Sequence, residues 1–398
     1  CSMISVEEAK DIITNRTQQL PETKMNVVNS VGHTVSENVV AKINIPSFDN
    51  SAMDGFSLIH SDIENGVKEF IILEDIKAGN HKKIFVRSGE CAPIFTGAPI
   101  PNGADTIIMV EKTSEKDGKM IIKKGYNSTI GKHIRLLGEQ IKEGKIALKK
   151  GDIINPSAAS YLSALGETKV QVYSSPKVKI ITTGNEIVQA GNPLKSGQIY
   201  ESNSTALISL LKEQNVSDIY HEVGKDTIKE LLSTLKDVEK YDIVILTGGI
   251  SVGKYDFVAD CLERIGVKKE FHKVAQKPGK PLYFGTKGNT LFFALPGNPA
   301  AVITSYYQYI YPAIQKMMGS KKITLKQSSL PLLQNVRIKA NRANFLKGKI
   351  SKEGVEVLSG QGSHILSSFA IADCLIYLPK GKKDWGKGEN VEVHILPE

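Results

Sequence analysis

The stretch IVILTGGISVGKYDF, residues 243–257, joins a short apolar run to a glycine-rich turn and then to the start of an amphipathic segment. The apolar run is typical of a buried strand, and a helix is predicted directly after it, over 257–265. The same alternation recurs on both sides, with strands predicted at 178–181, 219–223, 282–284 and 291–295 and helices at 204–214, 227–240 and 299–318. Strands that alternate with amphipathic helices indicate a mostly parallel sheet that is covered on both faces.

The flanking segments have a different pattern. A helix is predicted to begin after Ser5, which has Glu8 three residues further on. Residues 44–140 alternate short apolar runs with turn residues and predict a β-rich module, with strands at 70–73, 84–86, 106–110 and 120–122. Residues 323–398 predict a small β-barrel, with strands at 336–338, 355–358, 374–378 and 391–395.

We therefore expect a multidomain α/β protein with a central doubly wound, mostly parallel sheet. The predicted parts are a mixed N-terminal module (1–43 with 141–174), a β-rich insertion module (44–140), the α/β domain (175–322) and a C-terminal small β-barrel (323–398).

Composition excludes several classes of protein. The 398 residues hold 51 Lys and Arg against 42 Asp and Glu, a net charge of +9, but few of these cations are arginine. Arginine is the residue preferred for bidentate recognition of bases, so no nucleic-acid partner is expected, although a local site for small anions stays open. The four cysteines form no CxxC pair, and no apolar run has the length of a membrane helix. Without a signal-peptide pattern, and with Cys1 and Ser2 expected to precede the natural start at Met3, we expect a cytoplasmic protein with no membrane partner.

Ligands of open parallel sheets bind where the strands end at their carboxyl edge. Four loops of special composition follow predicted strands: TTGNE (182–186), TGGISVG (247–253), KPGKP (277–281) and PGNP (296–299). Glycine turns bring backbone N–H groups close to a phosphate, although a tight turn alone also explains Gly248 and Gly249.

Charged residues in and near these loops suggest a bound anion and a cation. Lys277 and Lys280 flank a Pro-Gly turn and can neutralise an anion. Carboxylates of Glu186, Asp226 and Asp256 can hold Mg²⁺, which takes oxygen ligands. The alternative is that these acids only stabilise helix starts, with Asp226 as the N-cap of the helix over 227–240.

The β-rich segment adds two loops, 49–56 and 95–105, each of which an ordinary hairpin explains by itself. The first places an apolar Ala-Met pair just before Asp54, which is unusual for a solvated turn. HExxH, Cys/His clusters and GxSxG are missing from the sequence, which disfavours zinc hydrolysis and serine acyl transfer.

Taken together, these motifs resemble the molybdopterin molybdenumtransferase family, the molybdenum insertases of MoeA type that are similar to the E-domain of gephyrin. The resemblance covers essentially the whole chain. The matching strings are DNSAMDGF (49–56), FTGAPIPNGAD (95–105), TTGNEI (182–187), GQIYESNS (197–204), TGGISVGKYDF (247–257), KPGKPLYFG (277–285), LPGNPAAV (295–302) and QGSHILSS (361–368).

The resemblance implies an enzyme that inserts molybdenum from molybdate into adenylylated molybdopterin and releases AMP with Mg²⁺ present. It implies functional carboxylates at Asp54, Glu186, Asp226 and Asp256, of which the last three would bind the metal. Other residues implied to bind substrate or molybdate are Thr96, Gly248, Gly249, Ser251, Gly253, Lys277, Lys280, Pro281, Pro296, Asn298, Pro299, Arg342 and Ser363.

The resemblance also implies a homodimer, in which the N-terminal domain serves as linker and dimerisation domain and the β-rich module of one subunit reaches the site of the other. A molybdopterin adenylyltransferase would supply the substrate, and molybdoenzymes or their chaperones would accept the product. The chain departs from the family pattern at Asn185, Gln140 and Lys347, where the family often has Asp, Asp and Arg. Two other functions stay open: the preceding adenylyltransferase step, which needs only the α/β domain, and a gephyrin-like scaffold without catalysis.

Overall fold

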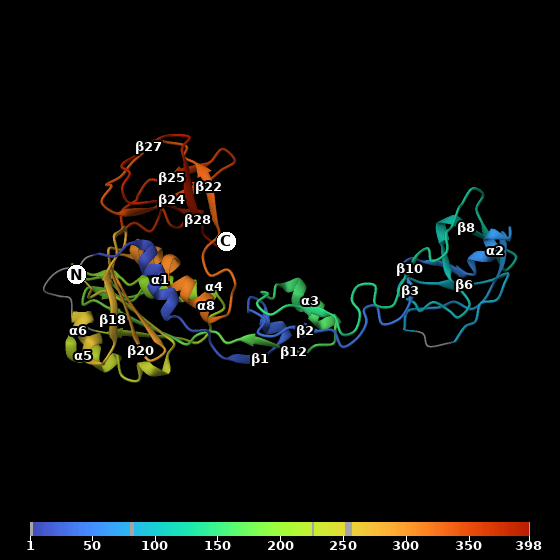
Figure 1. Cartoon of the computed structure of the whole chain (residues 1–398), viewed down its shortest axis with the longest axis horizontal. Coiled ribbons are helices and arrows are strands. Elements are labelled where there is room, and N and C mark those ends of the chain that lie inside the picture. Colours follow the sequence, from blue (N-terminus) through green and yellow to red (C-terminus); the bar gives the residue numbers. More distant parts are fainter. Residues whose placement is uncertain (1–2, 80–82, 225–226, 251–256, 398) are drawn as a thin grey trace. The chain divides into compact units, whose positions relative to one another are not determined.

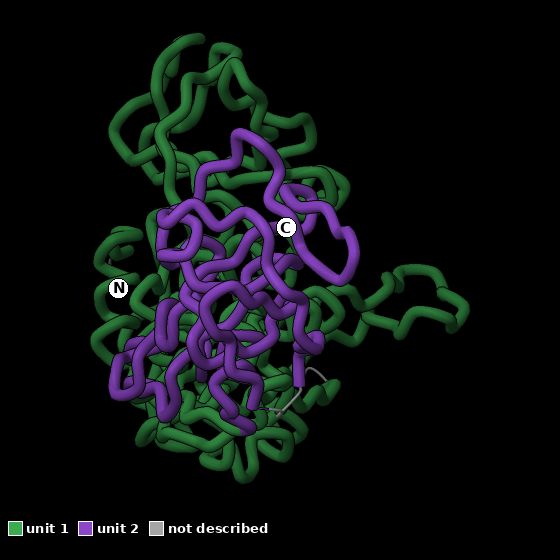
Figure 2. Tube along the Cα trace, turned by 90° about the vertical axis from the view of Figure 1, so that its right-hand side faces the viewer, with its two compact units in different colours: residues 1–37, 150–159, 169–398 green, residues 38–149, 160–168 purple. Residues whose placement is uncertain are grey.

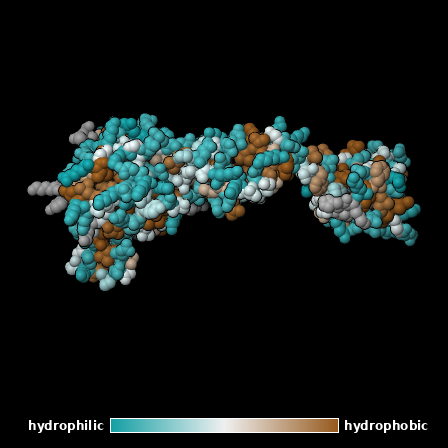
Figure 3. All heavy atoms as spheres, turned by 90° about the horizontal axis from the view of Figure 1, so that it is seen from below, coloured by the Kyte–Doolittle hydropathy of each residue, from teal (hydrophilic) through white to brown (hydrophobic). Residues whose placement is uncertain are grey.

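The computed structural model describes residues 3–79, 83–224, 227–250 and 257–397 and contains two compact units (Figures 1 and 2). The first unit comprises residues 1–37, 150–159 and 169–398, and the second comprises 38–149 and 160–168. Within the described ranges, no helix has both the length and the apolar character that crossing a membrane requires. Hydrophilic side chains cover much of the face drawn in Figure 3, between smaller apolar patches.

A six-stranded sheet forms the centre of the first unit. Its strands lie in the order β16 (Ile219–Gly224), β13 (Val178–Thr183), β17 (Ile243–Thr247), β21 (Thr290–Leu295), β20 (Pro281–Lys287) and β18 (Lys268–Lys273). The first four strands are parallel, and β20 is antiparallel to both β21 and β18. Five strands therefore point the same way, and the mostly parallel sheet predicted from the sequence is confirmed.

Helices cover both faces of this sheet. Successive side chains of a strand point to opposite faces, so Ile180 packs into one core and Ile181 into the other. The first core includes side chains of α1, α4 and α7, and the second includes side chains of α5 and α6. The doubly wound arrangement is therefore confirmed. The helices are α1 (Val6–Arg16), α4 (Asn203–Glu213), α5 (Ile228–Thr234), α6 (Phe257–Arg264) and α7 (Pro299–Ser305).

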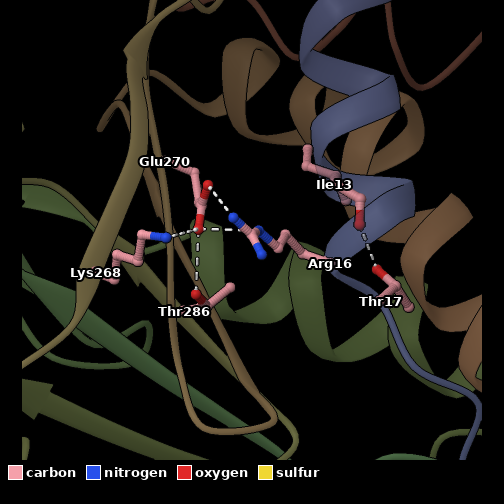
Figure 4. A network of polar contacts seen from close by, with 6 residues as sticks. All are labelled: Ile13, Arg16, Thr17, Lys268, Glu270 and Thr286. Atoms are coloured by element: carbon pink, nitrogen blue, oxygen red, sulfur yellow. Dashed lines mark hydrogen bonds and ion pairs between the residues drawn. The ribbon is translucent and has the colours of Figure 1, made fainter.

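The N-terminal helix α1 begins at the predicted cap, because Ser5 Oγ accepts a hydrogen bond from the Glu8 N–H at 3.0 Å. Its last turn is fixed to the edge strand β18 (Figure 4). Arg16 Nε lies 3.0 Å from Glu270 Oε1, and Arg16 Nη2 donates to Glu270 Oε2 at 3.1 Å. Two parallel contacts between a guanidinium group and one carboxylate fix orientation as well as distance.

Two helices differ from the sequence prediction. The helix predicted over 299–318 contains a π-helical segment, Tyr306–Ile310, between α7 and α8 (Tyr311–Met317). Pro312 has no N–H to donate to the preceding turn, which favours such a local change of hydrogen bonding.

The helix predicted over 227–240 is shorter. It ends as α5 at Thr234, and a 3₁₀ turn follows at Val238–Lys240 after Asp237, which has a left-handed backbone. The N-cap of α5 is Thr227, whose side chain accepts from the Glu230 N–H. Asp226, the N-cap considered from the sequence, lies outside the described residues.

The C-terminal part of the first unit forms a second six-stranded sheet. The strand order is β19 (Gln276–Lys277), β24 (Ala343–Ile350), β26 (Cys374–Leu378), β28 (Asn390–Ile395) and β22 (Gln327–Pro331), with β25 (Val355–Val357) also paired to β24. The segment predicted at 336–338 is the short β23 (Val336–Arg337), paired with β27 (Asp384–Trp385). Closure of these strands into a barrel stays a prediction, as does the four-domain division of the chain.

The second unit is built on a mixed sheet in the order β7 (Thr106–Met109), β4 (Gly55–Leu58), β6 (Glu90–Ile94), β5 (Glu69–Ile72), β9 (Lys119–Ile122) and β8 (Thr113–Lys116). The strand predicted at 84–86 is wrong. Phe85 makes only an isolated bridge with Asn102, and the Val86 N–H bonds to the carbonyl of that same residue at 2.8 Å. This stretch therefore pairs with a loop and not with a strand of the sheet.

Short elements complete the two units. They are the paired strands β1 (Glu22–Asn26) and β12 (Lys169–Tyr173), β2 (Val39–Val40) and β11 (Ile146–Leu148), β3 (Asn50–Ser51) and β10 (Ile134–Arg135), β14 (Ile187–Val188) and β15 (Ile199–Tyr200), together with the helices α2 (His60–Glu64) and α3 (Pro156–Ala164).

Candidate functional site

A cavity of about 690 Å³ lies at the carboxyl edge of the central sheet, where the loops after β13, β17 and β21 meet. These loops converge because their strands are parallel neighbours. The cavity wall includes Glu186, Gly248, Gly249, Pro281 and the whole turn 296–299. All four loops that the sequence singled out therefore contribute to one cavity.

Gly248 and Gly249 form a bare stretch of backbone at the cavity wall. Both have positive φ angles, +88° and +62°. A Cβ atom at Gly248 would lie 2.4 Å from the carbonyl oxygen of Thr183, and one at Gly249 would lie 2.8 Å from Val258 Cγ2. The tight turn thus requires glycine for conformation and for space. Without side chains, these two wall residues also allow a ligand to approach the backbone closely, as a phosphate-binding loop requires.

Glu186 supplies a carboxylate to the cavity wall. The side chain is exposed and lies close to the backbone before it, because a Cβ atom at Gly184 would be 3.1 Å from Glu186 Oε2. In the described parts of the chain, no three His, Cys, Asp or Glu side chains form a group that could hold a metal ion. The other predicted members of this part of the site lie outside the described residues, namely Asp226, Ser251, Gly253 and Asp256.

The turn 296–299 begins α7 and forms another part of the wall. Pro299 occupies the start of the helix, and Asn298 is its N-cap without a capping hydrogen bond from its side chain. The turn is held from α4, since Asn203 Nδ2 donates to the carbonyl of Gly297 at 2.9 Å. Pro296 is buried and Asn298 is exposed, so the asparagine amide is the polar group that this turn offers to a ligand.

The lysine loop joins the central sheet to the C-terminal sheet. Residues 276–277 form β19, which pairs in parallel with residues 343–344 of β24. This pairing brings Lys277 and Arg342 to the same junction. Pro281 and His364 line the cavity. Four other predicted site residues near this junction do not line it: Lys277, Lys280, Arg342 and Ser363.

The loop 360–366 brings the C-terminal sheet into the cavity wall through His364 and Leu366. Its position against α7 is fixed by a hydrogen bond from the Ala300 N–H to the carbonyl of Ser363 at 3.0 Å. Lys347, one of the departures from the family pattern, is buried on β24 and donates to carbonyl groups of this loop. Burial lowers the pKa of Lys347.

Sequence reasoning missed several residues of the wall. Glu201 fixes the start of α4 by accepting from the Ser204 N–H at 2.8 Å. These residues lie within strings that carried the resemblance, 197–204 and 361–368, and a polar run at a predicted helix start was the available signal. The missed wall residues include Tyr200, Glu201, Ser202, Asn203, His364 and Leu366.

In the second unit, Asp54 and Thr96 form a directly bonded pair, although they are 42 residues apart. Asp54 Oδ1 accepts from the Thr96 N–H at 2.7 Å and from the Thr96 hydroxyl at 2.8 Å. Hydrogen bonds to the charged form of a carboxyl favour ionisation, and the two bonds from Thr96 lower the pKa of Asp54. The loops 49–56 and 95–105 thus act together, although the local pattern of each is that of an ordinary turn.

Thr96→Val is expected to raise the pKa of Asp54 towards its ordinary value. The variant keeps the backbone donor and the branched shape but removes the hydroxyl donor, so the ionised form loses part of its stabilisation. Carboxyl ¹³C chemical shifts followed against pH would measure the change. Thr113→Val is the control, because that hydroxyl donates to the carbonyl of Val110 elsewhere in the unit. An Asp54 titration that is identical in wild type and Thr96→Val would contradict the assigned cause.

The parallel sheet with a glycine turn, a carboxylate and a helix start around one cavity defines an α/β protein with a ligand site at its carboxyl edge. Three family profiles match the chain and identify a family within this class of protein. The profile described as "Probable molybdopterin binding domain" matches residues 179–316. Those described as "MoeA N-terminal region (domain I and II)" and "MoeA C-terminal region (domain IV)" match residues 4–166 and 329–396.

Individual relatives cover the whole chain. Proteins named molybdopterin molybdenumtransferase from Staphylococcus aureus (strain N315) and Haemophilus influenzae are each 32% identical to it, over 99% of this chain and 96% and 100% of theirs. The crystal structure of the molybdopterin biosynthesis MoeA protein from Pyrococcus horikoshii OT3 is 27% identical, with a TM-score of 0.83 over 99% of this chain and 100% of that one. The chain belongs to the molybdopterin molybdenumtransferase family. It is a transferase with a role in molybdenum cofactor biosynthesis.

Proposed function

We propose that the chain inserts molybdenum from molybdate into adenylylated molybdopterin and releases AMP in a reaction that requires Mg²⁺. The observation that carries the proposal is the composition of the cavity wall, in which the bare peptides at Gly248 and Gly249 lie with Glu186 and the turn 296–299. Bare peptides suit a phosphate group, and a carboxylate suits a cation that accompanies it. A substrate that carries phosphate groups fits both features.

A single carboxylate at the cavity is compatible with a magnesium ion, which keeps several waters and takes few protein ligands. Glu186 offers an oxygen donor at the cavity, and we propose that Asp226 and Asp256 complete the protein ligands. When bound, Mg²⁺ would offset the negative charge of the substrate phosphates. The chain's own part is to hold the substrate against the glycine loop, which Ser251 and Gly253 extend in this proposal. Rate enhancement would then come mainly from positioning and electrostatics.

Molybdate is a tetrahedral dianion, and we propose that it binds near the junction of the two sheets of the first unit. The pairing of β19 with β24 supports this location, because it brings Lys277 and Arg342 to one junction, and Pro281 of the same loop lines the cavity. Ammonium and guanidinium groups attract oxyanions, and arginine can bind them through two hydrogen bonds. The proposed molybdate residues are Lys277, Lys280, Pro281, Arg342 and Ser363, and those that shape the substrate wall are Pro296, Asn298 and Pro299.

We further propose a cytoplasmic homodimer in which the Asp54 and Thr96 pair acts at the cavity of the other protomer. Dimerisation would involve the N-terminal domain over 1–43 and 141–174. The bonded geometry of the pair supports a functional role, since it keeps an exposed carboxylate ionised and oriented. A molybdopterin adenylyltransferase would deliver the substrate, and molybdoenzymes or their chaperones would receive the product.

The test is an assay of AMP release by the purified full chain from adenylylated molybdopterin. We expect release that depends on both molybdate and Mg²⁺, and we expect no adenylylation when ATP and molybdopterin are supplied instead. Adenylylation from ATP would identify the chain as an adenylyltransferase. No AMP release under any of these conditions would leave the scaffold function as the better explanation.

A further inference from the structure

We infer that Lys347 is a positioning residue, whose ammonium group holds the loop 360–366 in the shape in which it forms part of the cavity wall. The effect of Lys347 on turnover rests on the proposed function, but its effect on the loop does not. Lys347 lies in β24, and the loop follows β25 in the sequence. The segment 358–373, all of it described, contains no helix or strand that would give the loop an order of its own.

The ammonium group directs its donors to three carbonyl oxygens of this loop. Lys347 Nζ lies 2.8 Å from the oxygen of Gly360, 3.1 Å from that of Ile365 and 3.4 Å from that of Gly362. A lysine has three N–H donors and no acceptor, so these contacts account for all of its hydrogen-bonding capacity. Hydrogen bonds from an ionised donor are stronger than neutral ones. One side chain therefore fixes both ends of the loop.

Burial makes the ammonium and the loop depend on each other. Lys347 is only 3% exposed, and its ammonium also lies 5.5 Å from the centre of the Phe369 ring. A buried cation is costly unless hydrogen bonds replace its hydration. Here the three carbonyls supply that replacement, so displacement of the loop would leave the charge without partners in the protein interior.

Further bonds connect this anchored loop to the cavity. The Gln361 side chain accepts from the Lys347 N–H at 3.0 Å and donates to the Lys347 carbonyl at 2.9 Å, so the loop is bonded to β24 through backbone as well as ammonium. On its other side, the carbonyl of Ser363 accepts from the Ala300 N–H in α7. His364 and Leu366 reach the cavity wall from the segment between these attachments. Loss of the lysine would therefore disturb the wall without removing a residue from it.

Hydrogen exchange of the full chain tests the inference directly. In Lys347→Met, backbone amides of 360–366 are expected to exchange at least about tenfold faster than in wild type, since each factor of ten reflects about 1.4 kcal/mol of lost local stability. Lys349→Met is the matched control, because Lys349 lies on the same strand, is exposed and pairs with Asp373 at 2.9 Å. Its loop exchange should equal that of wild type. Unchanged loop exchange in Lys347→Met would overturn the inference.

Kinetics separate positioning from direct molybdate binding. A disturbed wall is expected to raise KM for adenylylated molybdopterin about tenfold in Lys347→Met, with kcat changed less, because positioning of the substrate is impaired. A rise confined to KM for molybdate, with wild-type loop exchange, would instead make Lys347 an oxyanion ligand and overturn the inference. If wild type releases no AMP, the proposed function fails while the exchange experiment still decides the role of the lysine.

Lys347→Arg serves as the second variant if Lys347→Met does not fold. Arginine keeps the charge but spreads its donors over a plane, so it cannot direct three N–H groups from one nitrogen. In Lys347→Arg, the exchange rate of the loop amides is expected to lie between the rates of wild type and Lys347→Met. If Lys347→Met does not fold, the expected result is an exchange rate in Lys347→Arg that is higher than in wild type. Exchange equal to wild type in every folded variant would show that the lysine does not hold the loop.

Discussion

Gly248→Ala is expected to reduce molybdate-dependent AMP release on the order of 100-fold, the loss typical of a substrate misplaced by about 1 Å. The new methyl group would lie 2.4 Å from the carbonyl oxygen of Thr183, which belongs to the backbone of β13 and cannot rotate away. The turn must therefore move, and with it the part of the cavity wall that Gly248 and Gly249 form. Activity and thermal unfolding of the same preparation would measure the effect.

The free energy of unfolding of Gly248→Ala should fall as well. A left-handed backbone costs an L-residue roughly 1–2 kcal/mol, and relief of the contact with Thr183 adds about 1–3 kcal/mol, as at other overpacked positions. Gly288→Ala is the matched control: its φ is +56°, but no atom lies within 4 Å of the added Cβ. Gly288→Ala should lose only the free energy of unfolding that corresponds to the left-handed backbone, and it should keep full activity. Equal behaviour of the two variants would contradict a requirement for close approach at Gly248.

Glu186→Gln is expected to lower kcat/KM for AMP release on the order of 100-fold, comparable to the loss of one electrostatic contact in other active sites. The amide keeps the shape of the side chain but has no charge to hold a divalent cation. The Mg²⁺ concentration for half-maximal activity should therefore rise, and binding of Mn²⁺, followed by electron paramagnetic resonance, should weaken in parallel. Because Glu186 is exposed, stability should change by less than about 0.5 kcal/mol.

Glu263→Gln provides the control for this change. Glu263 lies on α6 and pairs with Lys269 at 2.6 Å, in a contact that is exposed on both sides. The control should show wild-type turnover and wild-type dependence on Mg²⁺. A Glu186→Gln enzyme with unchanged dependence on Mg²⁺ would remove Glu186 from the proposed metal ligands, even if its activity were reduced.

The fold of the central domain could largely be predicted from local sequence pattern, and the errors of the prediction also have local causes. Strands β13, β17 and β21 are short apolar runs bounded by glycine or proline, which is the usual signature of a buried parallel strand. By contrast, the sequence pattern did not predict β24, because its sequence, ANFLKGKI, contains two lysines and a glycine. One of those lysines is buried and bonded within the protein, which no periodicity of apolar residues can indicate.

The candidate site was predictable in its location but not in its contacts. The position of Glu186 and Gly248 at one edge follows from strand direction, because parallel strands present their carboxyl ends together. The pairing of Asp54 with Thr96 could not be derived from two separate turns, since it depends on the ladder between β4 and β6. The sequence likewise did not predict that residues 200–203 line the cavity, because this depends on the contact between α4 and the turn 296–299.

Local sequence patterns were sufficient to predict the alternation of strands and helices, the direction of the central strands and the edge at which their loops converge. These features depend on spacings of two to four residues, over which side-chain periodicity acts directly. Three features became apparent only from the folded chain: the side chains that line the cavity, the bonds from Lys347 to a loop 13 to 18 residues away, and the bonds from Thr96 to Asp54. Such contacts form between segments that packing brings together, and their energies depend on burial and geometry that no local pattern records.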